Sequence, residues 1–106
     1  MPKLSLGLGV QNLRKVGGGT IFRILISGAG TTTSNGEYVW DGVAIVDGKP
    51  YYLSGNNELF WDGAQWTIVD QDGLSGDSSY SSLDLITWTI ENGESPAPTS
   101  TLYYTP

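Results

Sequence analysis

The side chains of this chain that could do chemistry are aromatic rings and carboxylates. Its 106 residues include four tryptophans, six tyrosines and eleven acidic residues, but no histidine and no cysteine. Flat rings beside carboxylates are suited to carbohydrate binding, because rings stack on the apolar face of a sugar while acids accept hydrogen bonds from its hydroxyls. The candidate ligand-binding aromatics are Trp40, Tyr51, Trp61 and Trp66. The alternative, which we favour for any single tryptophan, is that these rings form the core of a small β domain.

The carboxylates suggest two further kinds of site, a cation loop and a catalytic pair. The segment Asp70–Asp77 places oxygen ligands around glycines, as hard cations such as Ca²⁺ require. Its spacing is not that of an EF-hand and no glutamate closes it, so we expect a solvated acidic loop, no metal and no cofactor. Without histidine or cysteine there is no Ser–His dyad and no zinc chemistry. A glycosidase-like carboxylate pair remains, but most acids stand in Asp-Gly turns, so we expect no catalytic residue and no enzyme.

These side chains must be positioned by strands, because helical periodicity is nearly absent. Apolar or alternating segments predict strands at residues 21–26, 37–40, 43–46, 51–54, 59–61, 66–69, 85–90 and 102–105. The segment 71–82, rich in Gly, Ser and Asp, is expected to be a loop. Neighbouring Tyr51 and Tyr52 must point to opposite faces of their strand. The sequence therefore predicts an all-β fold, a small antiparallel β-sandwich or a partly open barrel built of short hairpins, with an extended N-terminal arm; of the two we prefer the sandwich.

Asn-Gly and Asp-Gly dipeptides mark the expected turns. They begin at Asn35, Asp41, Asp47, Asp62 and Asn92. This chemistry is preferred in tight hairpins because both residues tolerate positive φ. Three of the dipeptides fall within residues 41–63, which predicts an antiparallel meander there. Trp40-Asp41-Gly42 is echoed by Trp61-Asp62-Gly63, so we expect two similar hairpins in one sheet.

Charge divides the chain into a basic arm and an acidic body. Residues 1–23 carry a net charge of +4 and no acid, whereas residues 24–106 carry −10, with Lys49 as their only base. A body of that charge repels nucleic acid and anionic membranes, so we expect neither as a partner. We divide the chain into an arm with a glycine linker, residues 1–19, and a β module, residues 20–106. We recognise no signal peptide and no apolar run long enough to span a membrane.

The arm has the pattern of an isolated strand. Its opening, LSLGLGV, is apolar at every second residue, and Gly17–Gly19 forms a flexible joint. Such a strand can add to the exposed edge of another protein's sheet, where main-chain hydrogen bonds provide affinity and alternate side chains fill pockets. We therefore expect it to dock on another molecule, exchange between identical copies included; the alternatives are that it is the first strand of the domain itself or that it is disordered. The anchoring residues would be Leu4, Leu6, Leu8, Val10, Arg14 and Lys15.

Four stretches of the body form a recognisable pattern. They are SGAGTTTSNGEYVWDG, DGKPYY, FWDGAQWTIVD and APTS, all within residues 27–100. Together they resemble a small β module that recurs in tail-fibre and other virion proteins of tailed bacteriophages, and LSLGLGV with the basic residues and glycines after it resembles the start of short phage structural proteins. The resemblance implies fold-defining roles for the matching aromatic and turn residues and brings no catalytic residue with it. The matching positions are Asn35, Gly36, Tyr38, Asp47, Gly48, Pro50, Tyr52, Trp61, Asp62, Gly63 and Trp66.

On these grounds we expect a non-enzymatic virion structural protein, either a capsid decoration or cement protein or a module of a head or tail fibre. It would be assembled in the host cytoplasm and anchored in the virion through the arm. Its expected partners are other capsid or tail proteins and copies of itself, because symmetric assemblies present several anchor sites around one axis. The alternative is a carbohydrate-binding adhesion module that recognises a host-surface glycan. Adhesion predicts an exposed patch of Trp or Tyr, whereas a structural role predicts buried tryptophans.

Overall fold

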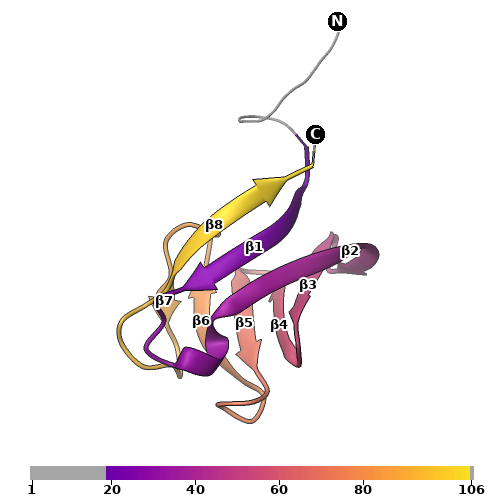
Figure 1. Cartoon of the computed structure of the whole chain (residues 1–106). Coiled ribbons are helices and arrows are strands. Elements are labelled where there is room, and N and C mark those ends of the chain that lie inside the picture. The colour runs from indigo at the N-terminus through magenta and orange to yellow at the C-terminus, as the bar shows by residue number, and fades with distance from the viewer. Residues whose placement is uncertain (1–18, 106) are drawn as a thin grey trace, which may run out of the picture.

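The computed structural model describes residues 19–105, which form one antiparallel sheet of eight strands curled into a half-barrel (Figure 1). The strands are β1 (Ile21–Ser27), β2 (Gly36–Val46), β3 (Lys49–Ser54), β4 (Asn57–Trp61), β5 (Trp66–Asp70), β6 (Asp77–Ser82), β7 (Thr89–Ile90) and β8 (Thr99–Tyr104). One turn of 3-10 helix, η1 (Thr32–Ser34), lies between β1 and β2. The all-β prediction is confirmed, and of the two expected architectures the partly open barrel forms, because a single continuous sheet curls instead of two sheets stacking.

Strands β1 to β7 follow one another as a meander, and only β8 departs from this order. The strand order is β7-β6-β5-β4-β3-β2-β1-β8, so β8 returns to pair with β1 and the sheet has β7 and β8 at its edges. The chain between them, residues 91–98, is here named the closing segment. It is bonded to the turn after β1, because Gly30 N donates to Pro96 O at 2.9 Å and Glu94 N donates to Thr31 Oγ1 at 2.8 Å.

The core lies on the inner face of the curled sheet, and three buried tyrosines link it by hydrogen bonds to the surrounding backbone. Because side chains alternate along a strand, one face of every strand points inward. The fully buried residues of these inward faces include Ile24, Leu59 and Ile68. Three tyrosines are also fully buried, and each donates its hydroxyl proton to a backbone carbonyl. These bonds run from Tyr38 to Ser34 at 2.7 Å, from Tyr52 to Ile21 at 2.7 Å and from Tyr80 to Glu94 at 2.6 Å. The hydroxyls thereby hold η1, the start of β1 and the closing segment against the sheet.

One predicted hairpin is wrong, and its neighbour is confirmed. Asp47 (φ 52°) and Gly48 (φ 83°) form the tight turn between β2 and β3. Asp41-Gly42 instead lies within β2, which continues past it with a register shift between Trp40 and Ile45. The extra residues form a bulge because the Asp41 carboxylate binds the local backbone, which lets β2 pair with β3 on both sides of the interruption.

Two predictions in the second half of the chain are also wrong. The expected loop 71–82 ends in a strand, β6, because Tyr80 enters the core and the small serines around it pair with β5. The expected strand 85–90 is reduced to the two residues of β7. Leu85 adopts a positive φ of 66° and turns into the core with Trp88, so this stretch covers the inside of the curl instead of extending the sheet.

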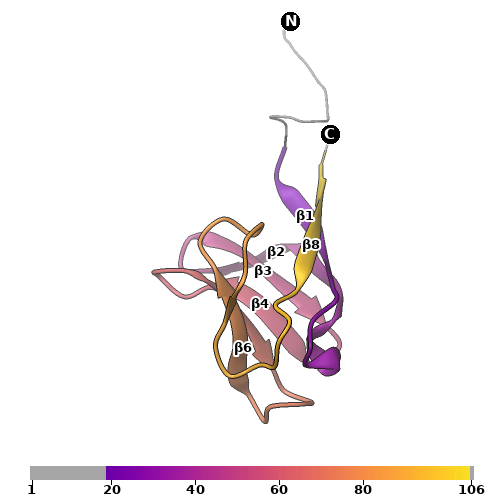
Figure 2. The same cartoon turned by 90° about the vertical axis from the view of Figure 1, so that its left-hand side faces the viewer.

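Both ends of the described chain lie at one pole of the molecule, where β1 and β8 project together beyond the other strands (Figure 2). Thr20 N donates to Thr105 Oγ1 at 3.0 Å, and Thr105 N donates to Thr20 O at 2.8 Å. The pair β1 and β8 is here named the terminal ribbon. Within residues 19–105, no helix has the length and apolar character needed to cross a membrane.

Candidate functional site

The structure brings three of the four candidate aromatics to the inner side of the sheet. Trp40 and Trp66 pack against the core, and Trp66 lies edge-on to Trp61 with 5.7 Å between ring centroids. Tyr52 joins them, with its ring 6.1 Å from that of Trp66. Trp40 is fixed further because its Nε1 donates to Ala44 O at 2.8 Å across the bulge of β2. These contacts favour the core interpretation for Trp40 and Trp66.

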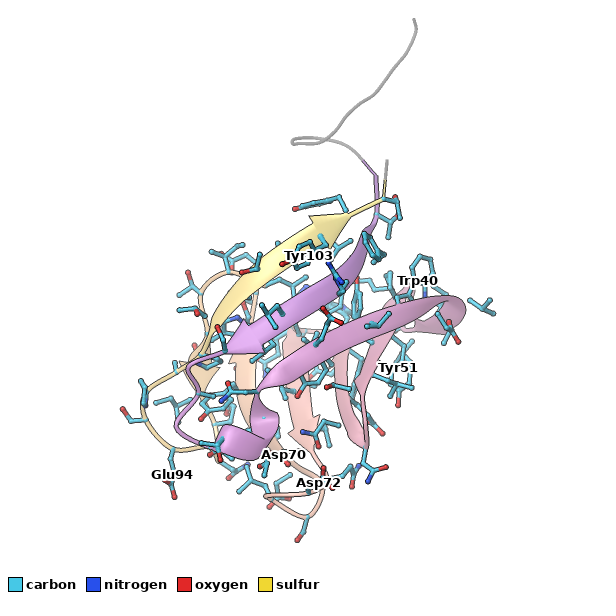
Figure 3. The ribbon with its side chains drawn as sticks, in the orientation of Figure 1. Trp40, Tyr51, Asp70, Asp72, Glu94 and Tyr103 are labelled. Atoms are coloured by element: carbon cyan, nitrogen blue, oxygen red, sulfur yellow. The ribbon has the colours of Figure 1, made fainter. Side chains whose placement is uncertain are left out.

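The fourth candidate, Tyr51, lies on the opposite face of the sheet (Figure 3). Its ring contacts Phe60 on the neighbouring strand, with 5.9 Å between centroids. Burial raises the pKa of the Tyr51 hydroxyl, and Glu58 beside it raises that pKa further. Tyr51 therefore cannot share a ligand with the inward-facing tryptophans, which agrees with the expectation that Tyr51 and Tyr52 face apart.

Trp61 is half-buried, as Trp40 and Trp66 are, but unlike them it is not packed against the core cluster, and it is the last residue of β4. The Nζ of Lys49 lies 5.3 Å from its ring centroid. The turn after Trp61 meets the β2–β3 turn, since a Cβ placed on Gly63 would stand 2.8 Å from Asp47 Oδ2. One indole, one ammonium and the Asp47 carboxylate thus converge at this place, which is here named the hairpin corner (residues 47, 49, 61 and 63).

Three aspartates act as turn caps. Asp41 Oδ1 accepts from Val43 N and Ala44 N, each at 2.8 Å. Asp62 and Asp84 repeat this pattern with the amides two and three residues after them, at 2.8–2.9 Å. These bonds lower the pKa of Asp41 and of Asp84, chiefly through the backbone N–H three residues on. The sequence echo around Asp41 and Asp62 is therefore a shared Asx turn, set in a bulge in one case and in a hairpin in the other.

Asp70 is the centre of a buried polar network, which the expectation of a solvated acidic loop missed. Its Oδ2 accepts from Ser34 Oγ at 2.6 Å and from Thr33 Oγ1 at 2.7 Å, and its Oδ1 accepts from Gly73 N at 2.6 Å. Burial raises the pKa of this carboxyl, but the bonds from Ser34, Gly73 and Thr33 outweigh burial, so the pKa lies below its ordinary value. Asp70 is 0 % exposed. It ties η1 to the loop after β5.

The remaining acids of this loop do not gather around a cation position. Asp72 lies further out in the loop than Asp70 (Figure 3), and from the other side chains of residues 19–105 it accepts a single long bond, from Asn56 at 3.4 Å. Among residues 19–105, no three acidic side chains come together in a way that could hold a metal ion. The carboxylate of Asp70 accepts from hydroxyl and amide donors, so its role is to hold two segments of the chain together.

The terminal ribbon carries a group of residues that the sequence patterns did not single out. The Arg23 guanidinium lies 4.0 Å from the ring centroid of Tyr103 on β8, and its NH1 forms an ion pair with Glu37 at 3.1 Å. Next to it on the outer face, Val39 and Leu53 are paired across strands and are 41 % and 45 % exposed. The sequence of β1 indicates the position of Arg23, because a charged residue within an apolar run must point to the outer face of the strand.

The predicted anchoring arm lies outside the described residues. Leu4, Leu6, Leu8, Val10, Arg14 and Lys15 belong to this part of the chain. Comparison with protein-family models, with curated proteins and with solved structures finds no match. The resemblance to the phage module therefore stays a prediction based on residues 27–100.

Proposed function

We propose that the protein is a non-enzymatic accessory structural protein of a bacteriophage particle, a capsid decoration or cement protein or a module of a head or tail fibre. Residues 1–16 attach it to other virion proteins, and the half-barrel is displayed outward. The observation that carries this proposal is the placement of charge. The ends of the described domain meet at one pole, from which the basic residues 1–18 lead off along the chain, and all eleven acids fall between Glu37 and Glu94 in the sequence, outside the strands β1 and β8 that carry those ends.

The carboxylates support a role without catalysis. Asp41, Asp62 and Asp84 each hold two backbone amides of their own turns. Both oxygens of Asp70 accept hydrogen bonds, Oδ2 from Ser34 and Thr33 and Oδ1 from Gly73 N. An acid whose Oδ1 holds the amides of its own turn is oriented by the local backbone, whereas a catalytic acid must be directed at a substrate.

Removing residues 2–16 tests the attachment step. The described domain has its own core and its own hydrogen-bonded ends, so we expect the shortened chain to keep its circular dichroism spectrum and its cooperative unfolding. Binding to virions prepared without the protein, measured by co-sedimentation, should fall at least about tenfold, because a strand added to a sheet edge supplies most of the affinity in this mode.

A second variant separates loss of the arm from loss of its apolar face. Leu6→Asp with Leu8→Asp keeps the length and the bases but places charge where pockets would receive leucine, and it should release the protein from particles as the deletion does. Unchanged sedimentation of either variant with particles would overturn the attachment role. Unfolding of the shortened chain would show that the arm is a strand of the domain itself.

One specific observation favours a second candidate, glycan binding by an adhesion module. The hairpin corner presents the partly exposed ring of Trp61 beside Lys49, with the tip of the β2–β3 turn adjacent. A ring bordered by charged hydrogen-bonding groups matches the chemistry of a sugar ring, which has an apolar face and a hydroxyl rim.

Trp61→Ala tests this second candidate. We expect glucose, galactose and N-acetylglucosamine, alone and as disaccharides, to shift the tryptophan fluorescence of the native chain, and Trp61→Ala to abolish the saturable part of that shift. Tyr51→Ala is the matched control, because its ring lies on the other face of the sheet and should leave the titration unchanged. Equal responses from Trp61→Ala and the native chain would remove the hairpin corner as a glycan site.

A further inference from the structure

The two edges of the sheet differ in how they are protected. Strand β7 has only two residues, and short edge strands are one means by which proteins prevent unwanted pairing. Strand β8 has six residues, TSTLYY, with no charged residue and no proline. Within residues 19–105, β8 pairs with β1 alone, so its second edge has no strand beside it. A long, uncharged edge strand is a template for pairing with another chain.

The register of the terminal ribbon shows which groups of β8 face this free edge. Thr105 N donates to Thr20 O, and Leu25 opposes Thr101 in the ladder between β1 and β8. Amide groups alternate between the two edges along a strand. The amides of Tyr103 and Thr101 therefore point toward β1 with that of Thr105, and the amides of Ser100, Leu102 and Tyr104 point toward the free edge.

Charge also makes this edge the place where two copies can approach each other. The chain as a whole carries −6, which drives copies apart wherever their acidic surfaces meet. Residues 19–36 and 95–106 contain no acid, and the only charge on the ribbon is Arg23, which Glu37 neutralises. Two molecules joined through β8 would therefore meet along strands that carry no acid, and the acid next to a residue in contact with β8 is Asp84, beside Leu85, whose carbonyl accepts from Ser100 Oγ.

We propose that β8 pairs with β8 of a second copy, antiparallel and about a two-fold axis at Leu102, to give one continuous sheet of two half-barrels. In this register Leu102 opposes Leu102 of the partner subunit, and Ser100 opposes Tyr104 of the partner subunit. All three outward amides of each copy then find carbonyl partners. Isologous pairing of this kind needs no second surface, because the same strand serves on both sides. The proposal rests on β8 alone and does not depend on attachment by residues 1–16.

A charged residue on the edge tests the pairing. In the proposed register Thr101 faces Tyr103 of the partner subunit, whose ring carries the Arg23 guanidinium, so Thr101→Lys places like charges together. Thr89→Lys is the matched control, since Thr89 is also an exposed threonine on an edge strand but belongs to β7. Sedimentation equilibrium over a range of concentrations should give dimers for the native chain and for Thr89→Lys, and a dissociation constant at least about tenfold higher for Thr101→Lys. A monomeric native chain, or equal dimerisation of both variants, would overturn the proposal.

Two further measurements show which strand pairs with the free edge of β8: hydrogen exchange of its amides, and dimerisation of the chain without residues 2–16. The amides of Ser100, Leu102 and Tyr104 should exchange more slowly as protein concentration rises, whereas the amide of Ile90 on β7 should not change. The chain without residues 2–16 should dimerise as the native chain does, even if it no longer binds particles. Loss of the dimer in that shortened chain would instead identify the arm of another copy as the strand on β8 and overturn the β8–β8 pairing.

Discussion

Replacing Asp70 with alanine should lower the free energy of unfolding by about 3 kcal/mol, because three donors, among them the buried Ser34 hydroxyl, lose a charged acceptor at once. Ser34 Oγ, Thr33 Oγ1 and Gly73 N all donate to this carboxylate. Ser34 retains a bond to Ser79 at 2.9 Å, whereas no other hydrogen bond of the Thr33 hydroxyl is seen within the described residues. For a domain of this size we expect the melting temperature to fall by roughly 15 °C.

Thermal and urea unfolding monitored by circular dichroism measures this loss, and two variants control it. Asp72→Ala changes an acid of the same loop whose carboxylate makes one long bond within the described part of the chain, so we expect a change within about 0.5 kcal/mol. Asp70→Asn keeps an acceptor for Gly73 and lets the two hydroxyls rotate to accept, so its cost should be smaller than that of alanine. Equal stability of Asp70→Ala and Asp72→Ala would contradict the central role of Asp70.

The pH dependence of the stability of Asp70→Asn gives a second, independent test of the role of Asp70. The folded protein holds the pKa of Asp70 below its usual value near 4. The carboxylate therefore stabilises the fold above about pH 4, and this contribution is lost as the pH falls through the lowered pKa. Asp70→Asn has no proton to gain, so its stability deficit relative to the native chain should shrink between about pH 7 and about pH 3. Asp41 and Asp84, whose pKa values are also lowered, titrate in both proteins and cancel in the comparison.

Local patterns predicted the strands where the sequence signal and the packing agree. The apolar run of β1 and the strands on either side of the Asp47-Gly48 turn follow directly from alternation and turn chemistry. Strand β6 could not be predicted in this way, because DSSYSS resembles a loop until Tyr80 is known to fill the core. The return of β8 to β1 was equally inaccessible, since pairing of residues about 80 positions apart leaves no local pattern.

In the candidate site, too, features set by neighbouring residues could be predicted, whereas those set by long-range packing could not. Period-two alternation correctly separated Tyr51 from Tyr52, because that rule depends only on neighbouring residues. It could not show that Lys49 lies over Trp61, since this contact depends on two hairpins folding to the same corner. Asp70 was assigned to a solvated loop because nothing in residues 70–77 indicates that η1 covers it. The charge division into a basic N-terminal part and an acidic body was readable from composition alone, and the fold adds that the acid-free segments form adjacent strands.

Gly93→Ala should be the other strongly destabilising change, because the closing segment lies directly on the ring of Tyr80. A Cβ at this position would stand 2.6 Å from Tyr80 Cζ and 2.9 Å from Ser79 O. Neither group can yield easily: Tyr80 is fully buried, and its hydroxyl bonds both Glu94 O and Thr31 N. We expect the free energy of unfolding to fall by about 2–3 kcal/mol, the usual cost of overpacking a rigid contact.

Glu94→Ala is the neighbouring control for this variant, because its side chain is exposed and its carbonyl, which binds Tyr80, is retained. It should unfold within about 0.5 kcal/mol of the native chain. The closing segment leads into β8, so a displaced segment should also loosen the strand that follows it. In Gly93→Ala the amides of Thr99 and Thr101 should therefore exchange faster, while those of β3 and β4 keep their native rates. Native stability of Gly93→Ala, or faster exchange spread evenly over all strands, would mean that the closing segment does not hold β8 in place.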